Sequence, residues 1–149
     1  MRLVIAMLSL LVAGCGSGGG DNYGYGFGYD AQVNGLRVRY SDGGMNEPSA
    51  DIVAMWFEQT LQCANSMETP ELSSIQVPPP LVIVVPPDTV DPYDGLTYYD
   101  TGTVLIERQW ALDRGLYVHE FVHWLLFIRH GSFHDNHNHL APEFSCRWN

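Results

Sequence analysis

A His-Glu-x-x-His motif at residues 119–123 constrains this chain more than any other feature. On a helix, His119 and His123 would project from the same face one turn apart, so both imidazoles can reach one cation. Glu120 stands where a carboxylate can take a proton from a water on that cation without being a ligand. Residues 117–128 are apolar on every side of such a helix, which indicates that it is buried. The motif therefore predicts one catalytic Zn²⁺ on a buried helix.

A second interpretation of the motif needs no metal. His119 and His123 could be core histidines bonded to backbone or water, with Glu120 in an ion pair. Burying these three groups without partners costs several kcal/mol, and a bound metal offsets that cost. The apolar surroundings therefore favour the metal site.

The third zinc ligand must come from outside the motif, because a hydrolytic zinc site has three protein ligands and one open position. All six histidines lie between residues 119 and 139, and more donors follow Gly131. The candidates are His134, Asp135, His137, His139 and Glu143. We predict His139, with Glu143 or His137 as the alternative.

The first fifteen residues have the features of an export signal. A basic start and an apolar run at residues 3–11 precede a Val-Ala-Gly-Cys sequence that ends at Cys15. This sequence resembles the lipobox of bacterial lipoproteins. The resemblance implies removal of residues 1–14, acylation of Cys15 and a lipid anchor in the bacterial cell envelope. Gly16 in place of Asp implies the outer membrane. The alternative is an ordinary secretory signal with a chance cysteine.

With Cys15 assigned to lipid, Cys63 and Cys146 remain. An exported compartment is oxidising, so we predict a disulfide between them. It would close a loop of roughly 80 residues and hold the C-terminal segment. The alternative is a pair of buried thiols.

Composition limits the class of partner. The chain has no Lys, and 7 Arg face 17 Asp and Glu, for a net charge of −10. Such an acidic composition argues against nucleic acid as a partner and against binding to anionic lipid through positively charged side chains. Its 149 residues allow a Gly-rich flexible tether at 15–32 and one domain at 33–149, which we expect to be a monomer.

The hydrophobic pattern predicts an α+β domain with a small mixed sheet and two main helices, the second carrying the motif. Asp113 is the expected N-cap of the motif helix and Gly131 its end. The expected elements are a strand at 36–40, a helix at about 49–66, a strand at 81–85, a hairpin of 96–99 with 103–107, and the motif helix at 113–130.

The order of these elements, with the motif on the second long helix, resembles the catalytic core of the zincin metallopeptidases. This resemblance implies zinc-dependent peptide-bond hydrolysis in which Glu120 activates a zinc-bound water. It also implies that a peptide substrate adds to an edge strand before the motif helix, which corresponds here to Thr97–Glu107. A stabiliser of the oxyanion is needed as well, and His134, His137 and Tyr98 are candidates.

The subgroup of zincins stays open. Leu126 and Arg129 occupy positions where metzincins have Gly and His. Glu143 follows His123 by 20 residues, a spacing that resembles the thermolysin-like group. Two other functions compete with hydrolysis: a lipoprotein that sequesters metal through its His-rich segment, and a catalytically silent envelope protein in which the zinc is structural.

Overall fold

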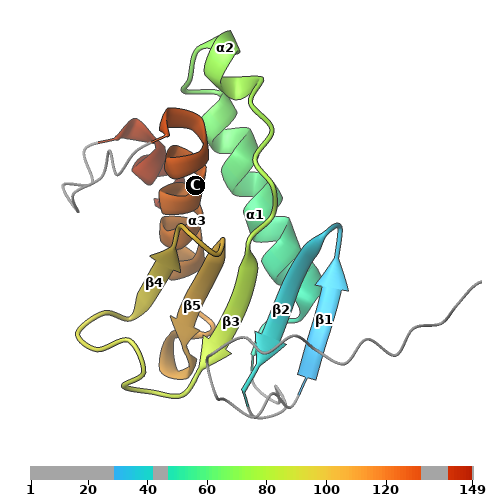
Figure 1. Ribbon diagram of the computed structural model, residues 1–149, viewed down its shortest axis with the longest axis vertical. Coiled ribbons are helices and arrows are strands. Elements are labelled where there is room, and N and C mark those ends of the chain that lie inside the picture. The colour runs from blue at the N-terminus through green and yellow to red at the C-terminus, as the bar shows by residue number, and fades with distance from the viewer. Residues whose placement is uncertain (1–28, 42–46, 132–140, 149) are drawn as a thin grey trace, which may run out of the picture.

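The computed structural model of this chain describes residues 29–41, 47–131 and 141–148. Its centre is a five-stranded mixed sheet in the order β1-β2-β3-β5-β4, with both long helices on one side (Figure 1). The strands are β1 Tyr29–Val33, β2 Leu36–Tyr40, β3 Leu81–Val85, β4 Gly95–Tyr98 and β5 Thr103–Glu107. The helices are α1 Ala50–Asn65, α2 Pro70–Ser73 and α3 Arg114–His130, with 3-10 turns η1 Arg108–Trp110 and η2 Pro142–Trp148. The predicted α+β class is confirmed.

Strand β1 corrects the predicted domain boundary. The tether was expected to reach residue 32, but residues 29–33 form a strand that pairs antiparallel with β2. Asn34 and Gly35 connect the two strands with φ of 50° and 85°, which are the left-handed angles that a tight hairpin turn requires. The predicted signal at 1–14, the acylated Cys15 and the tether up to residue 28 lie outside the described residues.

The sheet topology decides which strand is free to bind a partner. Strands β2, β3 and β5 are parallel, and α1 makes the crossover from β2 to β3. Strand β4 runs antiparallel to β5 at the edge of the sheet, so β5 has a neighbour on both sides. The predicted edge segment Thr97–Glu107 is therefore wrong in its second half, because only the β4 part of it lies at the edge.

Apolar side chains fill both faces of the central strands. Val82, Val84 and Ile106 point into the main core with α1 and α3, while Ile83 and Leu105 point to the other face and pack with Val90. Burial on both faces explains why residues 81–85 read as an uninterrupted apolar run. In the part of the chain that the structure describes, no helix combines the length and apolarity needed to span a membrane.

Helix α3 begins and ends where its sequence predicts. The Asp113 carboxylate accepts a hydrogen bond of 2.8 Å from the Gly115 N–H, which caps the first turn. Gly131 ends the helix at φ 66°, and its N–H donates to the Phe127 carbonyl at 2.9 Å. The helix packs against β4 and β5, against α1 and against η2, so it is buried along most of its length.

The predicted disulfide between Cys63 and Cys146 is confirmed, with an S–S distance of 2.07 Å. It joins α1 to η2 across 83 residues of sequence. Because η2 also packs against α3, the disulfide holds the C-terminal segment beside the motif helix.

Candidate metal centre

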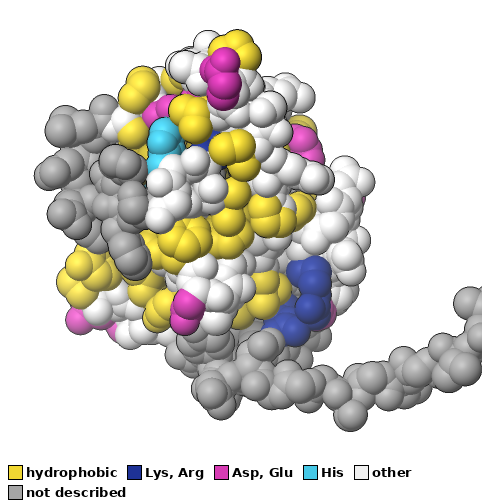
Figure 2. Space-filling model, turned by 45° about the horizontal axis from the view of Figure 1, so that its top comes forward, with side chains coloured by type: hydrophobic (Ala, Val, Ile, Leu, Met, Phe, Trp, Pro, Cys, Tyr) yellow, Lys and Arg dark blue, Asp and Glu magenta, His cyan; other side chains and the backbone are white. Residues whose placement is uncertain are grey.

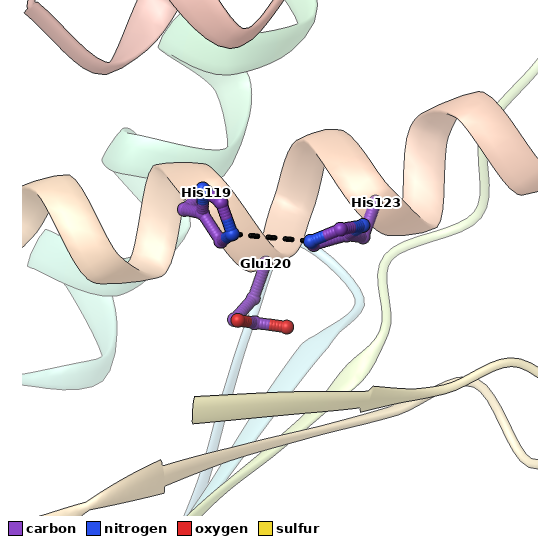
Figure 3. A group of neighbouring side chains, drawn as sticks. All are labelled: His119, Glu120 and His123. Atoms are coloured by element: carbon purple, nitrogen blue, oxygen red, sulfur yellow. Dashed lines mark hydrogen bonds between the residues drawn. The ribbon is translucent and has the colours of Figure 1, made fainter. Parts of the chain in front are cut away.

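The two motif histidines converge on one point. Their Nε2 atoms lie 3.1 Å apart, and the rings come from successive turns of the same face of α3 (Figure 3). His123 is buried and His119 is half-buried. Together with Glu120 they form a group whose potential ligand atoms all lie within 4.8 Å of one another.

The spacing of these nitrogens fits a zinc ion. Two imidazoles bound tetrahedrally at zinc–nitrogen distances of about 2.0–2.1 Å place their nitrogens about 3.3 Å apart. The distance of 3.1 Å between the two Nε2 atoms is close to this value. The two rings could therefore hold one Zn²⁺ with little movement. A third ligand remains to be placed, and the candidates His134, Asp135, His137 and His139 lie outside the described residues.

Glu120 points from α3 toward the edge strand β4 (Figure 3). The Thr97 hydroxyl donates a hydrogen bond of 2.6 Å to its Oε2 atom, and both side chains are buried. A Cβ atom at Gly95 would lie only 3.2 Å from both Cγ and Oε1 of Glu120. Gly95 thus leaves room for the carboxylate against the strand, and Thr97 fixes its direction.

Tyr99 contacts the second histidine. Its hydroxyl oxygen lies 3.4 Å from Nδ1 of His123, and its ring packs on Phe127 at 4.9 Å between centroids. When Nε2 binds a metal, Nδ1 carries the proton, so this N–H would donate to the Tyr99 oxygen. The Tyr99 hydroxyl can accept from Nδ1–H or donate to a bare Nδ1, so it is able to support the His123 tautomer in which Nε2 is free to act as a ligand.

Tyr98 does not reach the motif residues. Successive residues of a strand face opposite sides of the sheet, and Tyr98 packs with Ile83 and Leu105 on the side away from α3. Its predicted role as a stabiliser of the oxyanion is therefore wrong. Thr97 and Tyr99, on either side of it in sequence, face the motif instead.

The 3-10 turn η2 contributes an apolar side chain next to the two histidines. The Phe144 ring lies 5.1 Å from the rings of both His119 and His123, between centroids. This contact follows from the disulfide at Cys146, which brings η2 against α3.

Glu143, an alternative third ligand, is buried but does not belong to the His-Glu-His group. It interacts with Glu68, which pairs with Arg129 near the end of α3. Burial raises the pKa of the Glu68 carboxyl above its usual value, the Arg129 guanidinium opposes this rise, and the Glu143 carboxylate adds to it. Arg129 thus has a structural ion pair at the position where metzincins have a histidine ligand.

A pocket of about 560 Å³ adjoins the candidate metal centre. Its walls come from residues 92–97 and 99, from α3, and from Arg147 of η2. It contains His119, Glu120 and His123 and runs along the edge strand β4. This arrangement can place an extended peptide beside a metal ion held by His119 and His123 and beside the Glu120 carboxylate, which can accept a proton.

Sequence reasoning missed four residues around the motif, namely Thr97, Tyr99, Phe144 and Arg147. The alternation of strand β4 could have indicated Thr97 and Tyr99 as a pair on one face. The predicted disulfide could have drawn attention to Phe144 and Arg147, because they flank Cys146 in the sequence. No protein-family model matches this chain, and neither a curated protein nor a solved structure is significantly similar to it.

Proposed function

We propose that this protein is a zinc-dependent peptidase of the bacterial cell envelope. The observation that carries the proposal is the convergence of two imidazole nitrogens at 3.1 Å beside a carboxylate that Thr97 holds in place. Metal sites that hydrolyse peptides need this combination of neutral ligands and a separate proton acceptor.

Each residue of the group would have a distinct task. His119 and His123 would hold the zinc, with a third ligand for which His139 remains our prediction and His137 its alternative. A bound zinc ion supplies Lewis acidity, which makes a water more acidic and polarises the scissile carbonyl. Glu120 would take the proton of the attacking water and deliver it to the leaving amine. Thr97 would keep the carboxylate aimed at that water.

The edge strand β4 would hold the substrate. An extended peptide can add to an exposed edge through backbone hydrogen bonds, which recognise any sequence. The pocket is lined by residues of this strand and by the motif residues, so a peptide bound along β4 would lie beside the zinc.

The location in the envelope rests on the Val-Ala-Gly-Cys sequence and on the disulfide. A disulfide between Cys63 and Cys146 is suited to an oxidising compartment outside the cytoplasm. We propose that acyl chains on Cys15 anchor the protein there.

Substituting Glu120 with Gln tests the proposal. The variant should bind one zinc per chain and lose peptidase activity by about 10²- to 10⁴-fold, because an amide cannot accept the proton. Zinc content is measured by elemental analysis, and turnover by digestion of a peptide library with and without chelator. Glu58→Gln, an exposed change on α1, is the matched control.

Two results would contradict this assignment. Wild-type turnover by the Glu120→Gln variant would exclude the peptidase mechanism. Stoichiometric zinc in a His119→Ala variant would exclude the metal centre. Several weakly bound metals per chain without peptide cleavage would instead favour a metal-sequestering protein.

A further inference from the structure

The pocket beside the candidate metal centre has one cationic wall. Among the described residues that line it, Arg147 is the only Lys or Arg. It lines the same cavity as His119, Glu120 and His123, although it follows them by more than twenty residues in sequence.

The side chain of Arg147 lies across the first turn of α3. A Cβ atom at Gly115 would lie 3.4 Å from its Nε atom and 3.5 Å from its Cγ atom. Gly115 and His119 are four residues apart, so they share a face of the helix and are separated by about 6 Å along its axis. Arg147 therefore lies about one helical turn from His119 along α3, and it lines the same pocket as the candidate zinc ligands.

Positive charge is scarce in this acidic chain, which has seven Arg and no Lys. Arg37 and Arg39 pair with Asp30, Arg108 with Glu47, and Arg129 with Glu68. On the face drawn in Figure 2 the Arg side chains gather mainly in one small area, while Asp and Glu side chains are scattered. A net charge of −10 repels anions from most of the surface, so a cation inside the pocket changes which ligands can enter.

The disulfide next to Arg147 holds the backbone of this residue in place. Its neighbour Cys146 is bonded to Cys63 on α1, and Phe144 of the same turn packs against both motif histidines. A guanidinium presented from a fixed backbone can bind a carboxylate through two parallel hydrogen bonds.

We propose that Arg147 binds a carboxylate of the substrate, so that the enzyme prefers peptides carrying a carboxylate within one or two residues of the bond it cleaves. This inference rests on the proposed peptidase function and adds a substrate class to it. Either the C-terminal carboxylate of a short peptide or an acidic side chain can supply the group.

The experiment uses a panel of N-acetylated tri- to pentapeptides, each made in three forms. One form ends in a free carboxylate, one in a carboxamide, and one in a carboxamide with a Glu next to it. Wild-type protein should cleave the two carboxylate forms with kcat/KM about 10- to 100-fold above the plain carboxamide, which is the range for a charge-assisted hydrogen bond. Comparison of kcat/KM between the two carboxylate forms shows whether Arg147 prefers a C-terminal carboxylate or an acidic side chain.

Arg147→Gln should reduce the ratio of kcat/KM for the carboxylate forms to kcat/KM for the plain carboxamide to about one. Arg147→Lys should restore part of this ratio, because Lys returns the positive charge but cannot form two parallel hydrogen bonds to a carboxylate. The matched control is Arg114→Gln, which removes a charge from the same end of α3 but does not line the pocket. Intact mass and zinc content confirm that each variant keeps its disulfide and metal.

Binding is measured separately by calorimetry on the Glu120→Gln protein, with the free acid and the carboxamide of one peptide. Equal cleavage of acids and amides by wild-type protein would overturn the carboxylate preference and leave the peptidase proposal intact. If no peptide is cleaved, the peptidase proposal fails, and the calorimetric Kd values decide about Arg147. Equal Kd values for acid and amide would then overturn the inference, and a ratio of Kd values that Arg147→Gln abolishes would support it.

Discussion

Replacing both Cys63 and Cys146 with alanine should destabilise the domain strongly while leaving its fold intact. The disulfide closes a loop with a sequence separation of 83. For a loop of this length, the loss of entropy in the unfolded chain corresponds to about 4.5 kcal/mol of stability. A domain of about 120 residues has an unfolding entropy of about 250 cal/mol/K near 60 °C. The expected decrease in Tm is therefore about 15–20 °C.

The measurement is thermal unfolding of the wild-type and double-alanine proteins without reductant, followed by circular dichroism and calorimetry. Ser145→Ala is the matched control, because this exposed residue lies in η2 beside Cys146 and its loss leaves the disulfide intact. The reduced wild-type protein should behave like the double variant. A decrease in Tm of less than about 5 °C would refute the reasoning, because packing of η2 alone would then fix the C-terminal segment.

Two further predictions concern the residues that orient the motif. Thr97→Val removes the hydrogen bond to the Glu120 carboxylate, so kcat should decrease about 10- to 100-fold while zinc content and KM stay close to wild type. Thr97→Ser should recover most of the rate, and an unchanged kcat for the valine variant would remove Thr97 from the mechanism. Tyr99→Phe removes the partner of the His123 Nδ1 atom and should weaken zinc binding about tenfold or more, measured by competition with a chromophoric chelator. Tyr98→Phe on the opposite face of the strand should leave the zinc affinity unchanged, and an equal effect of both changes would show that the contact is not specific.

Much of the fold could be predicted because its signals are local. The N-cap at Asp113 and the glycine at 131 define the motif helix through two or three neighbouring residues. The apolar run at 81–85 identified a strand buried on both faces. The pairing of Cys63 with Cys146 followed from counting cysteines in a chain whose first fifteen residues predict export.

The missed features depend on contacts between distant segments. Residues 29–33 lie in a Gly- and Tyr-rich stretch that predicts a tether, and they become a strand because the Asn34-Gly35 turn folds them onto β2. The choice of β4 rather than β5 as the edge is set by strand order, which no local pattern encodes. Thr97 and Arg147 meet the motif only after the sheet and η2 have packed against α3.

The separation of the two bonded cysteines also has a consequence for the timing of maturation. If the chain is exported as we propose, Cys63 can reach its native partner only after every residue up to Cys146 has been synthesised and translocated. By then β3, β4, β5 and α3 have all been synthesised, so the disulfide forms when the residues that these elements contribute to the cavity are already present. In an exported protein of this kind, the disulfide that holds Arg147 beside the motif histidines would form only after the chain has left the reducing cytoplasm.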